Sequence, residues 1–249
     1  MSEVRAGERI AKFLARAGVA SRREAERLIE AGIVTVDGAV LTTPGFKVLP
    51  GMDVRVDGTR VKEKAPPRLW RFHKPGGLVT THKDPQGRPT VFEAVADRLP
   101  RVVSVGRLDL TTEGLLLLTN DGALARHLEL PSTGWVRRYR VRAFGRTDEQ
   151  ALDALKAGVE IEGVRYKPIR AEIDKAQGGN VWLTVAITEG KNREVRKVMD
   201  HLGLKVNRLI RTGYGPFLLG AMEPGAIEEV PTKQLREQLG RKICEEIGL

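Results

Sequence analysis

The sequence has few of the residues on which several common kinds of protein depend. Its single cysteine, Cys244, excludes a disulfide framework and a cysteine-based zinc cluster in a chain of 249 residues. The four histidines are His73, His82, His127 and His201, and their spacing matches no metal-binding motif. No uninterrupted apolar run approaches the roughly 20 residues that cross a bilayer. We therefore expect neither a metal site nor a membrane-spanning segment.

The sequence also lacks the motifs of several large enzyme classes. Gly190-Lys191 is followed by Asn192, and Val185 stands where a phosphate-binding loop has its first glycine, so there is no Walker motif. Neither G-x-S-x-G nor G-x-G-x-x-G occurs. These absences argue against nucleoside triphosphatases, hydrolases of the serine class and dinucleotide-dependent enzymes.

Positive charge is present in excess. The 42 Lys and Arg residues against 32 Asp and Glu give a net charge of +10, which points to a polyanionic partner. Hydrophobic residues make up 41% and charged residues 30% of the chain, as in a folded globular protein. Residues 1–18 are basic throughout and contain no apolar core of a secretory signal. We expect a cytoplasmic protein.

The first sixty residues form a unit of their own. Apolar residues at helical spacing predict a helix over 10–17, and the capping box Ser21-Arg-Arg-Glu24 opens a second helix. After Gly32 the period of the pattern changes to two, and the turn Asp37-Gly38 predicts a β-hairpin. A further extended piece is predicted at 53–56. We therefore expect a small helix-helix-strand domain.

A linker separates this unit from the remaining chain. The segment 62–68 carries charge, two prolines and no periodicity, which places domains at 1–61 and 69–249. In the larger domain, strands are predicted at 69–74, 102–105, 115–119, 138–144, 168–173 and 181–188, and helices at 91–99, 122–129, 148–157, 192–202 and 232–247. The strands outnumber the helices and do not alternate with them, which favours an α+β fold with mainly antiparallel pairing.

The two N-terminal helices carry basic residues on the side opposite their apolar face. These residues are Arg5, Arg9, Lys12, Arg16, Arg22, Arg23 and Arg27. A basic run on a single helix is usually a solvated face, but here two helices contribute, which favours binding to nucleic-acid phosphates. The stretch ERIAKFLARAGVASRREAERLIEAGIVTVDGAVL resembles the S-four-type (alpha-L) RNA-binding domain, which implies RNA binding.

Two further basic clusters lie in the larger domain. In the first, an alternating strand would project Arg138, Arg140 and Arg142 from one face and Tyr139 and Val141 from the other. The second cluster comprises Lys191, Arg193, Arg196, Lys197, Lys205, Arg208 and Arg211.

The loop Gly106-Arg-Leu-Asp109-Leu-Thr-Thr-Glu-Gly114 is the strongest candidate for a catalytic site. Asp and Thr commonly cap turns with their own side chains, which explains Thr111 or Thr112. That interpretation explains Arg107, Asp109 and Glu113 less well, and an acid in a loop between core strands is a site candidate. A buried carboxylate requires a cation, which Arg196 could supply, although spacing alone does not establish this pair.

Longer sequence motifs are present over nearly all of the chain beyond the linker. The motifs are GRLDLTTEGLLLLTNDG, HKPGG at 73–77, RRYRV at 137–141 and EGKNREVRKVM at 189–199. Together they resemble the RsuA/RluB/RluE/RluF family of pseudouridine synthases. RPTVFEAV at 88–95 and RLIRTGYG at 208–215 are most similar to the RluB subgroup, which acts on large-subunit ribosomal RNA. The resemblance implies an isomerase that modifies RNA in ribosome biogenesis and needs no cofactor.

The resemblance also implies roles for individual residues. Asp109 matches the catalytic aspartate, Tyr139 the aromatic residue that stacks on the base, and Arg196 the basic partner of the aspartate. Leu209 matches a position that lines the uracil pocket, while Lys74 and Pro75 match a structural motif. We expect Arg107, Lys191 and Arg193 to contact the substrate as well.

These implications lead to a specific expectation with stated alternatives. We expect a monomer that converts one uridine of large-subunit (23S) ribosomal RNA, free or in an assembly intermediate, to pseudouridine. The alternatives are an RsuA-like synthase acting on small-subunit RNA, an RluF-like synthase, and a non-catalytic RNA-binding assembly factor.

Overall fold

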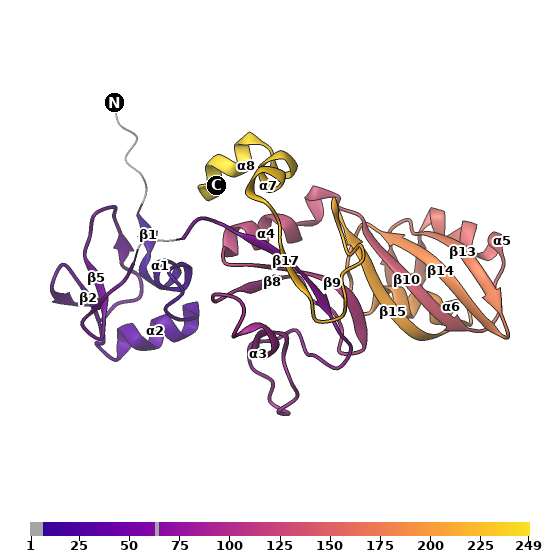
Figure 1. Ribbon diagram of the computed structural model, residues 1–249, viewed down its shortest axis with the longest axis horizontal. Helices are drawn as coiled ribbons and strands as arrows, with labels where there is room; N and C mark the ends of the chain where they lie inside the picture. Colours follow the sequence, from indigo (N-terminus) through magenta and orange to yellow (C-terminus); the bar gives the residue numbers. More distant parts are fainter. Residues whose placement is uncertain (1–6, 63–64) are drawn as a thin grey trace.

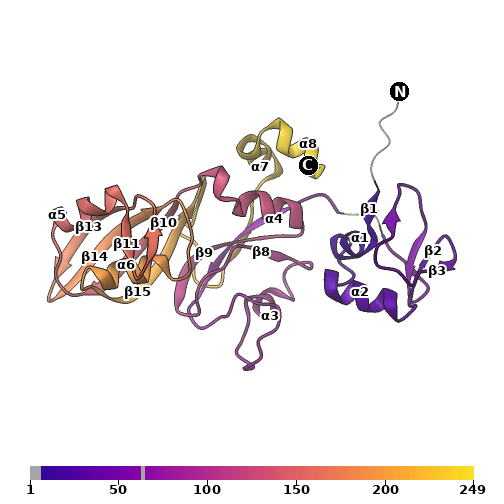
Figure 2. The same cartoon turned by 180° about the vertical axis from the view of Figure 1, so that it is seen from behind.

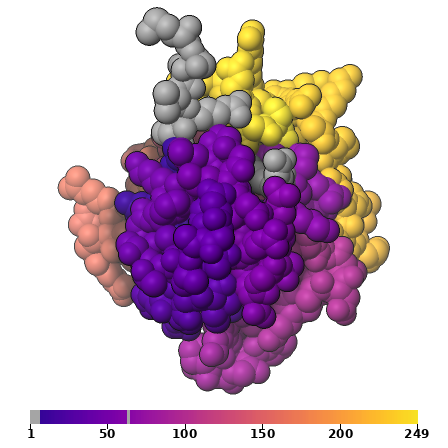
Figure 3. All heavy atoms as spheres, turned by 90° about the vertical axis from the view of Figure 1, so that its left-hand side faces the viewer, coloured from indigo at the N-terminus to yellow at the C-terminus, as the bar shows by residue number. Residues whose placement is uncertain are grey.

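The computed structural model describes residues 7–62 and 65–249, so the predicted RNA-binding residue Arg5 lies outside the described residues. Two units are visible along the longest axis of the molecule (Figure 1). The N-terminal unit lies at one end, and Figure 3 views it end-on, in indigo and violet, in front of the rest of the chain. None of the helices in the described ranges is long and apolar enough to cross a membrane.

The N-terminal unit has the predicted order of helix, capped helix and hairpin. Its elements are β1 (Glu8–Arg9), α1 (Ile10–Arg16), α2 (Arg22–Glu30), β2 (Val34–Val36), β3 (Ala39–Val40), β4 (Lys47–Val48), β5 (Val54–Val56) and β6 (Thr59–Arg60). Both hydrogen bonds of the capping box between Ser21 and Glu24 are present, and they fix the start of α2. Ile10, Leu14 and Ile29 are fully buried in a core that this unit forms from its own residues.

The larger unit is built on one mixed sheet, as the sequence predicts. Its strands are β7 (Leu69–Lys74), β8 (Val103–Val105), β9 (Thr112–Thr119), β10 (Arg137–Phe144), β13 (Arg170–Gln177), β14 (Asn180–Ile187), β15 (Lys205–Tyr214), β16 (Phe217–Leu218) and β17 (Ile227–Glu229). The strand order is β13-β14-β10-β15-β9-β7-β17, with β8 pairing β9 and β16 pairing β15. Within this sheet β9 and β15 pair in parallel, and the other pairs are antiparallel.

Helices cover both faces of this sheet. They are α3 (Val91–Val95), α4 (Gly122–Glu129), α5 (Glu149–Ala154), α6 (Glu194–His201), α7 (Thr232–Leu239) and α8 (Arg241–Ile247). Leu116 and Leu118 face a core shared with α3, α5 and α6, whereas Leu115 and Leu117 face a second core shared with α4, α7 and α8. The opposite views of Figures 1 and 2 show α3 on one side of β9 and α4, α7 and α8 on the other.

Two differences from the sequence prediction have physical causes. Strand β15 was not predicted, because its charged residues Lys205, Arg208 and Arg211 hide the pattern of a central strand. The helix predicted over 232–247 is divided at Gly240, whose φ of +75° interrupts the helical backbone between α7 and α8. A smaller antiparallel hairpin of β11 (Val159–Ile161) and β12 (Val164–Tyr166) was also missed.

Candidate active site

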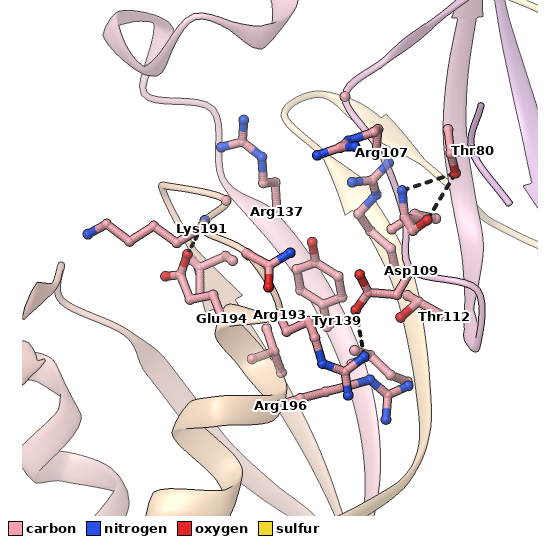
Figure 4. A pocket seen from close by; sticks show the side chains of 18 of the residues that line it. Thr80, Arg107, Asp109, Thr112, Arg137, Tyr139, Lys191, Arg193, Glu194 and Arg196 are labelled. Carbon is pink, nitrogen blue, oxygen red and sulfur yellow. Dashed lines mark hydrogen bonds and ion pairs between the residues drawn. The ribbon is translucent and has the colours of Figure 1, made fainter. Parts of the chain in front are cut away.

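A cavity of about 820 Å³ opens where the loop after β8, strands β10 and β15, and the start of α6 meet. The residues predicted from the sequence for catalysis or substrate contact all line it. They are Arg107, Asp109, Tyr139, Lys191, Arg193, Arg196 and Leu209. Residues from distant parts of the sequence are thus brought to one place, and Figure 4 labels all of them except Leu209.

Strand β7 and the segment after it hold the loop that carries Asp109 through hydrogen bonds. Lys74 Nζ donates to the backbone carbonyls of Thr112 at 2.8 Å and Leu110 at 3.3 Å. The amide of Gly77 donates to the Leu110 carbonyl at 2.8 Å, and the Thr80 hydroxyl donates to the Leu108 carbonyl at 2.9 Å. The Asp109 backbone is therefore held on both sides, which limits the positions open to its carboxylate.

The direct cationic partner of Asp109 is Arg193 and not the predicted Arg196. Arg193 Nη1 lies 3.6 Å from Asp109 Oδ2, as the dashed line in Figure 4 marks. Arg196 Nη2 donates instead to the Thr111 hydroxyl at 3.0 Å. Burial lowers the pKa of Arg196, and Arg193 lowers it further, while Asp109 acts in the opposite direction. Arg196 therefore contributes to the field at Asp109 without forming the expected pair.

Arg193 reaches Asp109 from an unusual backbone position. Its φ of +52° and ψ of +30° lie in the left-handed region, which residues other than glycine seldom adopt. It immediately precedes α6, whose first residue, Glu194, turns inward and is only 3% exposed. Strained backbone of this kind is concentrated at functional sites, which supports a role for this turn in the cavity.

Strand β10 contributes Tyr139 through the predicted alternation. Tyr139 and Val141 are buried, whereas Arg138, Arg140 and Arg142 are exposed on the other face. Leu209 pairs with Val141 on one side and with Thr112 of β9 on the other, so it lies between β10 and the Asp109 loop. Figure 4 shows the Tyr139 ring and the Asp109 carboxylate facing the same space.

Two buried ionisable residues beside the cavity were not predicted to act there. Lys74 is fully buried, and burial lowers its pKa to about 8. Burial raises the pKa of Glu194 to about 7, even though its Oε2 accepts a hydrogen bond from the Lys191 amide at 2.8 Å. The sequence signals available were the position of Lys74 at the end of an apolar strand and that of Glu194 among four basic residues.

The cavity lining is rich in cations. The basic residues that line it are Arg88, Arg107, Arg137, Lys191, Arg193, Arg196 and Arg211, and the acidic ones are Asp109, Glu129, Glu189 and Glu194. The guanidinium group of Arg137 already makes hydrogen bonds within the protein, because it donates to the Tyr214 hydroxyl at 3.0 Å and to the Thr188 carbonyl at 3.1 Å. A lining of this charge suits a phosphate-bearing ligand.

Glu113 does not belong to this cavity. Both of its oxygens accept from Arg208, at 2.8 and 3.0 Å, and this pair lowers the pKa of Glu113. The acid in the predicted loop that faces the cavity is therefore Asp109, and Glu113 offers a natural control for it. Within the described ranges, no three His, Cys, Asp or Glu side chains converge on a candidate metal site.

The structure places the described RNA-binding candidates of the N-terminal unit in three settings. Lys12 and Arg16 are both paired with Glu8, at 3.2 and 2.8 Å. Arg9 precedes α1 in the short strand β1, so it does not share the helical stripe that spacing predicted. Arg22, Arg23 and Arg27 of α2 are exposed.

Comparison with protein families matches both units. Residues 8–54 match the S4 domain, and residues 68–201 match the family described as RNA pseudouridylate synthase. The second match covers just over half of the chain and includes Asp109, Tyr139, Arg193 and Arg196.

Individual proteins are similar over greater lengths. An "Uncharacterized RNA pseudouridine synthase" of Rickettsia felis is 46% identical over 230 residues, covering 92% of this chain and 100% of its own length. The "Ribosomal large subunit pseudouridine synthase B" of Salmonella typhi is 46% identical over 220 residues, covering 84% and 74%. A solved structure titled "Crystal structure of pseudouridylate synthase" superposes with a TM-score of 0.63 at 25% identity, covering 92% and 98%.

Proposed function

Because this chain belongs to the RNA pseudouridylate synthase family, we propose that it isomerises one uridine of large-subunit ribosomal RNA in the cavity around Asp109. The observation that carries this proposal is the geometry of Asp109, a fixed carboxylate 3.6 Å from Arg193 in a cation-lined cavity that also holds Tyr139. The choice of large-subunit RNA is supported by the similarity to the Salmonella protein of that name. We place the protein in the cytoplasm as a monomer.

The reaction explains why one carboxylate is sufficient. Pseudouridine formation breaks the bond between C1′ of the ribose and N1 of uracil, turns the base, and joins C5 to C1′. The proton on C5 is finally replaced by one on N1, so no atoms are lost and no redox cofactor is required. Glycoside hydrolases use two carboxylates, one that protonates the leaving group and one that acts as nucleophile or as base toward water. Here uracil departs as a stabilised anion and is recaptured.

Asp109 is the residue that acts on the sugar. Its ionised carboxylate either attacks C1′ or removes the 2′ proton of the ribose, and both routes need a negative charge at this position. Arg193 orients the carboxylate by direct contact, and Arg196 interacts with it electrostatically from the same side of the cavity.

The target uridine must leave its helix to reach Asp109. A base stacked in a duplex is inaccessible, so the enzyme turns the nucleotide outward and holds the base in a pocket. Tyr139 supplies a flat surface for stacking, and Leu209 supplies an apolar wall. Arg107 is exposed at the rim, where it meets a flanking phosphate, and Lys191, whose ammonium group bonds to Glu189 and to the Arg165 carbonyl, borders the same rim.

The test is the formation of pseudouridine by Asp109→Asn and by Glu113→Gln. The first change keeps the shape of the side chain and removes its charge, whereas the second alters an acid outside the cavity. Pseudouridines are mapped by carbodiimide adducts in 23S and 16S ribosomal RNA incubated with each protein. We expect conversion in 23S RNA by wild type and Glu113→Gln, and none by Asp109→Asn.

Each contrary result has a defined meaning. Conversion in 16S RNA alone would move the target to the small subunit. Normal conversion by Asp109→Asn would remove the catalytic role of Asp109. No conversion by the wild type in either RNA, with binding intact, would favour a non-catalytic assembly factor.

A further inference from the structure

The sheet of the larger unit has an exposed face opposite the cavity. Strands β13, β14, β10 and β15 lie side by side at the end of the molecule farthest from the N-terminal unit (Figure 1). We call the outer sheet face the surface formed by Arg138, Arg140, Arg142, Phe144, Trp182, Thr184 and Arg208. The alternate residues of β10, Tyr139, Val141 and Ala143, are buried beneath it in the core shared with α5 and α6.

Cationic and aromatic groups are in contact across this face. The guanidinium carbon of Arg140 lies 4.8 Å from the centre of the Trp182 ring, and that of Arg142 lies 6.0 Å from it. Phe144, at the end of the same row, is 56% exposed. Aromatic rings and guanidinium planes side by side are the surface on which unpaired bases stack.

Positive charges lie close together on the outer sheet face, and they repel one another when no anion is bound. Arg142 lies directly opposite Arg208 on β15 in the strand register, and like charges in such a pair destabilise a sheet. Arg208 is compensated by Glu113, and Arg140 lies 3.8 Å from Asp174. Arg138 and Arg142 are exposed, and their positive charge would be offset by a bound polyanion.

We propose that the outer sheet face binds an unpaired segment of RNA, distinct from the nucleotide that enters the cavity. Phosphates contact Arg138 and Arg142, and a base stacks against the Trp182–Arg142 pair. An RNA fits better than an acidic protein surface, because it supplies both the negative charge and the flat bases that this face matches. The inference rests on the chain acting on RNA, and it does not depend on the role of Asp109.

The position of the outer sheet face indicates a role in recognising the RNA substrate. It lies across the sheet from the Asp109 carboxylate, so one RNA segment cannot occupy both places without passing around the sheet edge. A folded ribosomal RNA has such additional segments, whereas a short stem-loop does not. Contacts at the outer sheet face therefore add affinity for large structured RNA and leave the chemical step unchanged.

The test compares the full-length protein with two double variants of equal charge. Arg138→Gln/Arg142→Gln changes the outer sheet face and leaves Trp182 in place, whereas Lys233→Gln/Lys242→Gln changes exposed lysines of α7 and α8. Binding is measured with a labelled 20-nucleotide oligoadenylate, which contains no uridine, and turnover is measured on a stem-loop that carries the target. Trp182→Leu is a third variant that removes the ring and keeps both arginines.

The expected result is specific to the outer sheet face. Arg138→Gln/Arg142→Gln weakens oligoadenylate binding by about 3- to 10-fold and lowers the slope of log K against log salt by about 1 to 2 units. Trp182→Leu weakens binding at all salt concentrations, and kcat on the stem-loop stays within about twofold for both. Equal losses in the lysine control, or unchanged affinity in the two test variants, would overturn the proposal. So would capture of an acidic peptide with no change in RNA binding.

Discussion

The ammonium group of Lys74 lies 2.8 Å from the carbonyl oxygen of Thr112, fully buried at the end of β7 beneath the loop that carries Asp109. Its other acceptors are the carbonyls of Leu110 and Pro75. Asp109 and Glu113 interact with it only through space, and both act against the lowering of its pKa by burial. A buried charge that is bonded to three carbonyls serves to fix the backbone, so the precision of the Asp109 loop depends on it.

Replacing Lys74 should lower the rate of the reaction more than it lowers the affinity for the substrate. Lys74→Met keeps the length of the side chain and removes the hydrogen bonds from Nζ to the carbonyls of Thr112, Leu110 and Pro75, of which the Leu110 carbonyl still accepts from the Gly77 amide. We expect kcat to fall about 10-fold or more, since the carboxylate of Asp109 is less well placed, with little change in KM. Single-turnover rates on a target stem-loop measure this effect. Lys83→Met, in an exposed loop, is the control, and equal rates in both variants would refute the role of Lys74.

Glu194 predicts how stability depends on pH. Burial raises its pKa from 4.5 to about 7, so between these pH values the folded state holds a proton that the unfolded state has released. The stabilising effect of the protonated form is complete below pH 4.5 and is lost as the pH rises through 7. Urea unfolding should show Glu194→Gln gaining about 2.5 kcal/mol relative to wild type between pH 5 and pH 8. A constant difference across this range would show that Glu194 does not titrate there.

Gly114 predicts where the sheet tolerates no side chain. It has a φ of +100°, and a Cβ atom there would overlap the carbonyl oxygen of Arg211 and lie 2.7 Å from its amide nitrogen. Gly114→Ala should therefore lower the free energy of unfolding by more than about 3 kcal/mol, or prevent folding. Gly122→Ala is a matched control, because a Cβ at the start of α4 meets nothing within 4 Å. Comparable urea midpoints for the two variants would contradict the close approach of β9 and β15.

The N-terminal unit makes a prediction about which helix holds RNA. Lys12 and Arg16 share one acidic partner, Glu8, which offsets part of their charge, whereas Arg22, Arg23 and Arg27 are exposed. Changing the three arginines of α2 to Gln should therefore weaken binding of structured ribosomal RNA more than changing Arg9, Lys12 and Arg16 to Gln. Each lost phosphate contact also reduces the salt slope by roughly 0.7 to 0.9 units. A larger effect from the second triple variant would assign the contact to α1.

The linker between the units predicts a site of cleavage. Each unit has its own core, and Asn120 bonds to the Pro66 carbonyl and the Arg68 amide, which ties the end of the linker to the larger unit. Limited proteolysis should therefore cut first within 62–65, and a fragment starting at residue 66 should remain folded. First cleavage within 100–120 would show that the proposed division is wrong.

Features that depend on neighbours in the sequence were the ones that could be predicted. The capping boxes at Ser21 and Thr90 are both present, because each needs only a carboxylate three residues away. The alternation around Tyr139 was likewise readable from its strand alone. The pairing of Asp109 with Arg193 was not, because residues 84 positions apart meet only through the sheet, and the left-handed turn at Arg193 leaves no composition signal.

The order of assembly of the two units has a consequence during synthesis. Among the residues that the structure describes, the N-terminal core uses none beyond Val61, whereas the cavity is incomplete until Leu209 of β15 has paired with β9. A chain leaving the ribosome thus acquires its first unit long before its catalytic one, since domains fold in the order in which they emerge. The nascent protein is therefore able to bind RNA before it is able to modify it.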